Sequence, residues 1–263
     1  MIKKRCLIFI LVFSISCNKE REKHVYLLIG QSNMAGRGAI ETIDITPHKN
    51  VFMFTRNKQW VLAKEPMHFA RPERIGVGPG FAFGRKMAKN YPNADIYLIP
   101  CAVGATSIQK WERGAYHKTT QIYPYDSAMS VTKEALKVGE LKGILWHQGE
   151  SDSKPKRSAK YEERLKELMQ RIRTELNADS VPIVVGELGR FHAKRRPYAD
   201  SINEIINRVP QFIPFTAVVS SETLTDRNDS THFDSKSYRK LGKRYANKMI
   251  ELQKKRSDFF YRH

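Results

Sequence analysis

The chain has 263 residues, and its 46 Lys and Arg against 27 Asp and Glu give a formal net charge of +19. Such a charge favours anionic surfaces or acidic glycans, but the basic residues are scattered over segments with helical patterns, and no nucleic-acid-binding motif accompanies them, which argues against a nucleic-acid partner. Three cysteines are too few for a disulfide framework, and the length suits one α/β domain.

The N-terminal residues have the pattern of an export signal. The basic residues Lys3 to Arg5 precede an apolar stretch of about eleven residues, whereas a membrane span needs about 20. Small residues then lead to Cys17, which resembles a bacterial lipoprotein signal in which Cys17 would carry the lipid that anchors the protein to a membrane. Ordinary secretion and an uncleaved anchor are the alternatives. We expect an exported lipoprotein, periplasmic or at the cell surface, with a polar tether at 18–23 and a single domain at 24–256.

Beyond the tether, short apolar runs alternate with helical patterns, which is typical of βαβ units and a parallel sheet. The apolar runs predict strands at 24–30, 51–54, 95–101, 142–147, 181–187 and 215–220. The periodic segments predict helices at 79–90, 126–139, 156–177, 197–208 and 235–255. Continuous apolar strands suit a sheet that is covered on both faces. The expected fold is therefore a three-layer α/β/α sandwich with a central, mostly parallel sheet, whose substrate cleft is built by the loops at 31–50, 55–77 and 103–124.

Polar segments follow four of the apolar runs. The first reads GQSNMAGRG from Gly30 to Gly38 and places Ser32 where a buried strand gives way to a glycine-rich loop. The others read CAVG at 101–104, WHQGE at 146–150 and DSTH at 229–232. In open α/β folds, ligands bind at the carboxyl ends of the strands, so we expect these segments to form one site.

These segments contain what ester hydrolysis through a serine requires: a nucleophile, a base, an orienting acid and oxyanion donors. Ser32 is the candidate nucleophile and His232 the candidate base. Asp229, three residues earlier, can reach one imidazole nitrogen and leave the other facing Ser32; the alternative is that it only caps a turn. Gly104 lets its backbone N–H approach an oxyanion beside that of Ser32, and the side-chain amide of Gln148 is a third candidate donor.

Together, these segments resemble the SGNH hydrolase superfamily, specifically the branch that contains sialate O-acetylesterases and family 6 carbohydrate esterases, among them acetylxylan esterases. The stretches at 75–84 and 108–111 also resemble that branch, and the similarity extends over about residues 24–250. The resemblance implies an SGNH or flavodoxin-like fold with Ser32 as nucleophile and His232 as base.

The resemblance also implies an oxyanion hole formed by the N–H groups of Ser32 and Gly104 and by a side chain of the third segment. The superfamily has asparagine there, whereas this chain has Gln148, as is usual in the branch. The superfamily uses the aspartate at Asp229 as the acid, and the branch also implicates Glu150. We favour Asp229 as the main orienting acid, with Glu150 holding the neighbouring loop or contacting sugar hydroxyls.

The implied activity is removal of O-acetyl groups from carbohydrate through an acyl-enzyme intermediate. An acetylated plant glycan such as xylan and O-acetyl sialic acid are both candidate substrates. Candidate substrate-binding residues are Gln31, Asn33, Arg37, Trp111 and His147. Aromatic loop residues that can stack on a sugar are Trp60, Phe69, Trp111 and Tyr116, and Arg37 or Arg71 can attract a sugar carboxylate.

Two other functions are compatible with these motifs. A lipase or thioesterase would prefer longer acyl chains and need an apolar groove, and a glycan-binding lipoprotein would have lost the chemistry. No metal or other cofactor is expected: His147 and Glu150 lie three residues apart, but at a strand end rather than on one helical face. Cys101 stands alone and is expected to be a small buried hydrophobic residue rather than a nucleophile.

Overall fold

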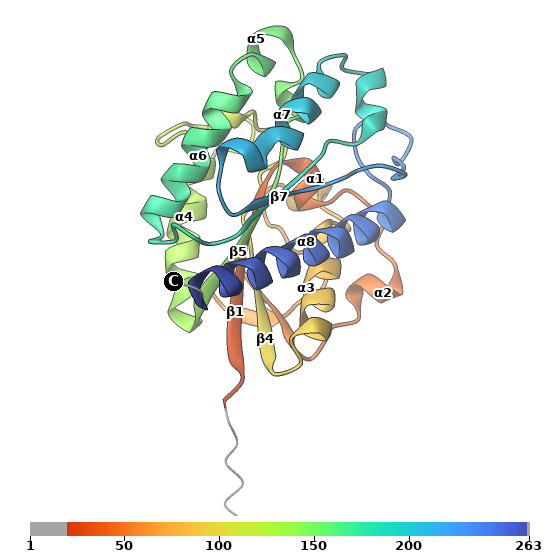
Figure 1. Ribbon diagram of the computed structural model, residues 1–263. Coiled ribbons are helices and arrows are strands. Elements are labelled where there is room, and N and C mark those ends of the chain that lie inside the picture. Colours follow the sequence, from red (N-terminus) through yellow and green to blue (C-terminus); the bar gives the residue numbers. More distant parts are fainter. Residues whose placement is uncertain (1–19, 262–263) are drawn as a thin grey trace, which may run out of the picture.

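The computed structural model describes residues 20–261, which form a seven-stranded sheet between two layers of helices (Figure 1). The strand order is β3-β2-β4-β1-β5-β6-β7. Among the strands of the described residues, only β3 is antiparallel to its neighbour, and the other pairs are parallel. The strands are β1 Glu22–Gly30, β2 Val51–Phe54, β3 Trp60–Leu62, β4 Ala94–Pro100, β5 Glu140–His147, β6 Ile183–Gly186 and β7 Thr216–Val219. The predicted three-layer fold with a mostly parallel sheet is confirmed.

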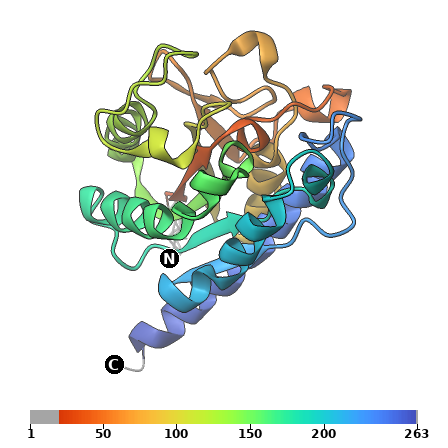
Figure 2. The ribbon, with the colours of Figure 1, turned by 90° about the horizontal axis from the view of Figure 1, so that it is seen from above.

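Alternation of side chains along β1 divides the core in two. Val25, Leu27 and Ile29 pack into the layer that contains α4, α6 and α7, whereas Tyr26 and Leu28 pack into the layer that contains α3 and α8. Figure 2 shows the two helix layers on either side of the sheet. The long helices are α3 Pro79–Asn90, α4 Pro124–Ala135, α6 Tyr161–Glu175, α7 Ala199–Phe212 and α8 Ser235–Tyr261.

The differences from the predicted elements are local. The predicted helix at 156–177 is divided into α5 Pro155–Ser158 and α6, and α4 ends in a 3₁₀ turn at Leu136–Val138. The short elements α1 Ser32–Ala35, α2 Thr42–Ile45 and β3 lie in segments expected to be loops, because three or four residues are too few for a hydrophobic period to show.

The N-terminal boundary also differs. β1 begins at Glu22, so the expected tether at 18–23 overlaps the first strand. Arg21 donates hydrogen bonds to the Asp95 carboxylate (2.6 Å) and the Ala94 carbonyl (2.7 Å), which fastens the chain to β4 before β1 begins. The predicted lipidation at Cys17 lies outside the described residues. Within residues 20–261, no helix is long and apolar enough to cross a membrane.

Candidate active site

The site begins where β1 ends, at the carboxyl edge of the sheet. Gly30 has a φ of +134°, and a Cβ there would lie 2.1 Å from the carbonyl oxygen of His147, so this position requires glycine. The N–H of Gln31 donates to the same carbonyl (2.9 Å), which fixes the turn against β5. The chain then enters α1 at Ser32, which lines a cavity of about 400 Å³.

Ser32, His232 and Asp229 form a hydrogen-bonded chain. The Nε2 of His232 lies 3.0 Å from the Oγ of Ser32, and its Nδ1 lies 2.8 Å from the Oδ2 of Asp229. The Oδ1 of Asp229 accepts the backbone N–H groups of Thr231 and His232, so one loop turn positions both side chains. The histidine thus lies between a hydroxyl and a carboxylate, an arrangement that suits proton transfer from the serine.

Burial and hydrogen bonding set the charges of this pair. Burial lowers the pKa of His232 below its ordinary value of 6.5, Arg37 lowers it further, and Asp229 acts in the opposite direction. Burial alone would raise the pKa of Asp229, but the hydrogen bonds from the backbone and ring of His232 outweigh it and hold that pKa below 3.8. At neutral pH the pair is therefore a neutral imidazole beside a carboxylate.

Ser32 and Gly104 line the cavity together. Within residues 20–261, neither of their backbone N–H groups donates to another protein group. A Cβ at Gly104 would lie 3.8 Å from the Cβ of Ser32 and 2.5 Å from the Nη2 of Arg37, so glycine keeps this narrow space open. Both N–H groups are available to a carbonyl oxygen that becomes negative beside Ser32.

The third expected oxyanion donor, Gln148, has its N–H groups used elsewhere. The side chain is fully buried and does not line the cavity. Its Nε2 donates to Gln31 Oε1 (3.1 Å), the Thr106 carbonyl (3.0 Å) and Asp152 Oδ2 (2.6 Å). An amide nitrogen carries only two hydrogens, so none remains for an oxyanion. The structure therefore corrects this expectation: Gln148 ties the end of β5 to the neighbouring loops.

Glu150 lines the cavity, and its Oε1 accepts a hydrogen bond from the side-chain amide of Asn33. The same amide nitrogen of Asn33 also donates to the backbone carbonyl of Thr231 (2.9 Å). The Oδ1 of Asn33 accepts a hydrogen bond from the hydroxyl of Tyr238 (2.6 Å). Asn33 is fully buried, so the expectation that it contacts substrate is corrected. It instead fastens the loop that carries His232, and Glu150 orients Asn33.

Two further expected substrate contacts are buried away from the cavity. Trp111 is 1% exposed and packs edge-on against Trp146, with ring centroids 5.3 Å apart. His147 is fully buried, with its Nδ1 3.0 Å from the hydroxyl of Tyr245. The expectation that Trp111 and His147 contact substrate is therefore corrected, because both side chains are buried in the core and neither lines the cavity.

The cavity beside Ser32 is strongly basic. Two of the expected substrate-binding residues line it, Gln31 and Arg37, together with six further cations: Arg71, Arg74, Lys154, Arg157, Arg195 and Arg196. Glu150 is the single carboxylate among its lining residues in the described chain. Most of these cations were not predicted as site residues. Arg195 and Arg196 could have been predicted, because the loop at 188–196 also follows a strand and such loops lie at the ligand-binding edge of the sheet.

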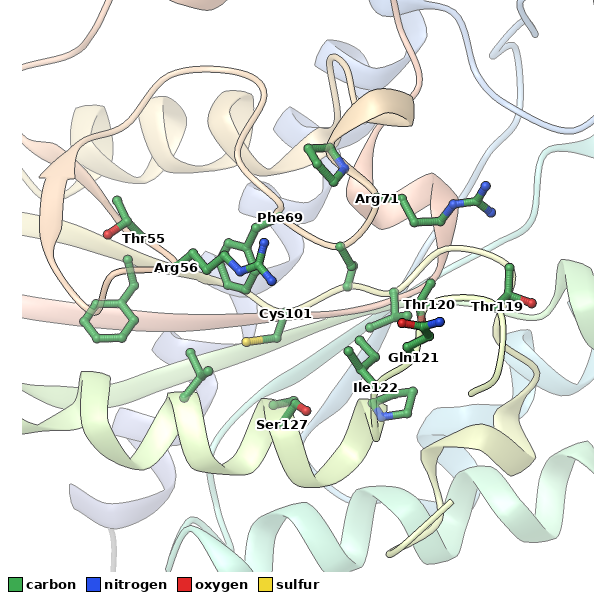
Figure 3. Close-up of a pocket in the computed structure, with 18 of the residues that line it drawn as sticks. Thr55, Arg56, Phe69, Arg71, Cys101, Thr119, Thr120, Gln121, Ile122 and Ser127 are labelled. Carbon is green, nitrogen blue, oxygen red and sulfur yellow. The ribbon is translucent and has the colours of Figure 1, made fainter. Parts of the chain in front are cut away.

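A second cavity, of about 530 Å³, has its lining residues drawn in Figure 3. Arg71 lines both cavities, and the chain passes from the second to the first between Val103 and Gly104. The second cavity is lined largely by apolar side chains, with Thr119, Thr120, Gln121 and Ser127 among its polar groups. Burial raises the pKa of Cys101, which also lines it, to about 12, so its thiol is unreactive at neutral pH.

The aromatic residues expected to stack on sugar do not line the cavity beside Ser32. Phe69 lines the second cavity. Trp60 packs against Phe54 and Tyr97, and the exposed ring of Tyr116 lies against Tyr123. Among residues 20–261, no group of three or more His, Cys, Asp and Glu side chains could hold a metal ion.

A three-layer fold with a serine, a histidine and an aspartate joined at the carboxyl edge of the sheet has the form of an SGNH hydrolase. The chain belongs to the family described as carbohydrate esterase, sialic acid-specific acetylesterase, which matches residues 22–251. The predicted resemblance is thus confirmed, and the protein is an enzyme of the carbohydrate acetylesterase class.

Individual relatives agree with this assignment. The probable carbohydrate esterase At4g34215 of Arabidopsis thaliana is 30% identical over 239 residues, which cover 83% of this chain and 86% of the relative. Its X-ray structure has a TM-score of 0.77 at 28% identity and covers 87% of this chain and 98% of that one. The structure of NanS has a TM-score of 0.72 at 17% identity and covers 90% of this chain and 99% of that one. The structure of XAC1771, a carbohydrate acetylesterase from Xanthomonas citri, has a TM-score of 0.69 at 17% identity and covers 87% of this chain and 56% of that one.

Proposed function

We propose that this enzyme removes O-acetyl groups from anionic glycans by a serine mechanism. The observation that carries the proposal is the chain from Ser32 to His232 to Asp229, which opens into a cavity lined by seven arginine and lysine side chains. The family supplies the reaction class, and the charges of the cavity supply the substrate class.

In the first half-reaction, the Oγ of Ser32 attacks the acetyl carbonyl carbon while its proton passes to the Nε2 of His232. Asp229 holds the Nδ1 proton, which keeps the imidazole in the tautomer that can accept, and stabilises the imidazolium that forms. The N–H groups of Ser32 and Gly104 stabilise the negative carbonyl oxygen. The His232 proton then goes to the departing sugar oxygen, which leaves an acetyl group on Ser32. Water, activated by His232, releases acetate.

An anionic sugar is favoured because the cavity has an excess of positive charge that its single carboxylate does not offset. Sialic acid and uronic acids both carry a suitable carboxylate. The second cavity is large enough to take a neighbouring part of the glycan, since small-molecule sites are typically about 300 to 1,000 Å³.

The test compares acetate release from O-acetyl sialosides, acetylated glucuronic acid derivatives and neutral acetylated xylooligosaccharides. We expect a higher kcat/KM for the anionic esters, with an advantage that shrinks as salt is raised, because salt screens exposed charges. Equal rates for neutral and anionic esters at all salt concentrations would contradict the proposed substrate class.

The largely apolar walls of the second cavity favour one alternative, hydrolysis of longer acyl esters. Esters of one alcohol with acyl chains of increasing length separate the two functions. The acetylesterase proposal expects activity to fall beyond acetyl, whereas a lipase or thioesterase would gain activity as the chain lengthens.

We also propose that the enzyme is exported and lipid-anchored, on the basis of the pattern around Lys3 to Cys17. Expression of the full chain in a bacterium, with Cys17→Ala as the matched variant, tests this. Membrane association that depends on Cys17 supports lipidation, and a soluble wild-type protein contradicts it.

A further inference from the structure

The proposed reaction places a negative charge on the carbonyl oxygen of the ester. A third hydrogen-bond donor to that oxygen, besides two backbone N–H groups, remains to be assigned. Gln148, the expected third donor, uses its amide hydrogens inside the protein. The N–H groups of Ser32 and Gly104 remain. Removal of a single such donor typically slows an enzyme by about 10² to 10³, so an additional group would have a large effect.

Arg37 is the side chain best placed for this role. Its Nη1 donates to the carbonyl of Gly36 (2.6 Å), which holds the guanidinium in one orientation. Its Nη2 lies 2.5 Å from the point that a Cβ of Gly104 would occupy, and the same point lies 3.8 Å from the Cβ of Ser32. The guanidinium and the Ser32 side chain therefore lie beside the same face of Gly104, in the space next to the reacting hydroxyl.

The charge of Arg37 is not offset by an acid. Within the described part of the chain, no carboxylate lies within ion-pair distance of this half-buried side chain. Arg71 and Arg239, by contrast, are paired: Arg71 lies 3.3 Å from Glu73, and Arg239 lies 2.7 Å from Asp44. An unpaired, partly desolvated cation is costly in the resting enzyme.

That cost is offset when a negative charge appears beside Arg37. The ester substrate has a neutral carbonyl and the tetrahedral intermediate has an anionic oxygen, so a fixed cation stabilises the transition state more than the ground state. Burial lowers the pKa of Arg37, but arginine starts from so high a value that the group stays charged.

We propose that Arg37 is a catalytic residue that donates a hydrogen bond from Nη2 to the oxyanion, in the position that Gln148 does not fill. The Ser32 Oγ–carbon bond forms, the Ser32 proton moves to His232, and the carbonyl π electrons move to the oxygen that Arg37, Ser32 N–H and Gly104 N–H bind. The guanidinium keeps its proton throughout. This assignment rests on the proposed serine mechanism and specifies its oxyanion site.

The competing role for Arg37 is to bind the carboxylate of an anionic sugar. The two roles differ on a neutral substrate without any carboxylate, such as p-nitrophenyl acetate. An oxyanion donor acts on every acetyl ester and mainly through kcat, whereas a carboxylate-binding group acts only on anionic glycans and mainly through KM.

The experiment measures kcat and KM of wild type, Arg37→Met and Arg37→Lys on p-nitrophenyl acetate and on an acetylated glycan. We expect Arg37→Met to lower kcat by about 10² to 10³ on both substrates with KM changed by less than about threefold. Arg37→Lys keeps the charge and should recover part of the loss. Arg208→Met is the matched control, because Arg208 on α7 pairs with Glu162 on α6, lines neither cavity, and should leave both parameters unchanged.

A second readout is the pH profile. Since Arg37 lowers the pKa of His232, Arg37→Met should move the acid limb of kcat/KM toward higher pH, which loss of a purely structural side chain would not do. Unchanged kcat on p-nitrophenyl acetate in a folded Arg37→Met protein would overturn the assignment. Full activity of Ser32→Ala would instead refute the serine mechanism itself, so the two failures are distinguishable.

Discussion

The carboxylate of Glu150 lies against the amide of Asn33, while the imidazole of His232 is oriented by Asp229. In the proposed mechanism, the two acids that the motifs offered as alternatives therefore have different tasks. Asp229 contacts the base directly. Glu150 acts on it through Asn33, whose amide also binds the carbonyl of Thr231, the residue before His232.

This division of roles predicts unequal effects of two conservative substitutions. Asp229→Asn should lower kcat by roughly 10⁴, as loss of the orienting acid does in serine proteases, because the amide favours the wrong imidazole tautomer. Glu150→Gln keeps an oxygen that can accept from Asn33 and should lower kcat by less than about tenfold. Steady-state kinetics on one acetylated substrate measures both, and a larger loss in Glu150→Gln than in Asp229→Asn would reverse the assignment.

Asn33 itself should matter for both stability and rate. Asn33→Ala leaves the buried carboxylate of Glu150 and the Thr231 carbonyl without this donor, at a cost of about 1 to 3 kcal/mol per unsatisfied group. We expect a lower free energy of unfolding by denaturant and a reduced kcat. Tyr238→Phe removes only one hydrogen bond to Asn33 and is the milder comparison, expected to cost about 1 kcal/mol. Wild-type stability in Asn33→Ala would show that this contact has no structural effect.

The pH dependence follows from His232. The base must be neutral to accept the Ser32 proton, so kcat/KM should rise with pH through the pKa of His232 and level off above it. Because burial and Arg37 place that pKa below 6.5, the plateau should already be reached at neutral pH. Rate measurements from about pH 4 to pH 8 on a neutral ester test this, and an acid limb centred above pH 7 would contradict it.

Cys101 should be dispensable. Its thiol is buried and its pKa of about 12 leaves almost no thiolate near neutral pH. Cys101→Ala and treatment of the folded enzyme with iodoacetamide should therefore leave kcat within about twofold of the untreated wild type. Rapid inactivation by iodoacetamide that Cys101→Ala prevents would show that the second cavity admits reagents to a reactive thiol.

Much of the arrangement of Ser32, Asp229 and His232 was predictable because sequence spacing constrains short-range geometry. Asp229 and His232 are three residues apart, so one turn suffices to join them, and Ser32 follows a strand whose end lies at the ligand-binding edge. The strands at β1, β2, β4, β5, β6 and β7 were predictable for a similar reason, because their buried runs are continuous and their bounds depend little on distant contacts.

The residues that were assigned wrongly depend on long-range packing. The amide of Gln148 donates to Asp152, four residues away, but also to Gln31 and Thr106, which only the folded loops bring close to it. Trp111 looked like a sugar-stacking residue because it lies in a loop, yet its ring enters the core against Trp146. The basic lining of the cavity draws on four separate segments of the chain and could not be assembled from any one motif.

The most direct test of the serine mechanism is mass spectrometry of the peptide that contains Ser32, after the enzyme is mixed with an acetylated glycan and quenched in acid. The mechanism predicts a transient acetyl group on Ser32 that forms no more slowly than acetate is released and is absent in Ser32→Ala. Release of acetate at the wild-type rate by Ser32→Ala, with no acetylated peptide, would contradict it.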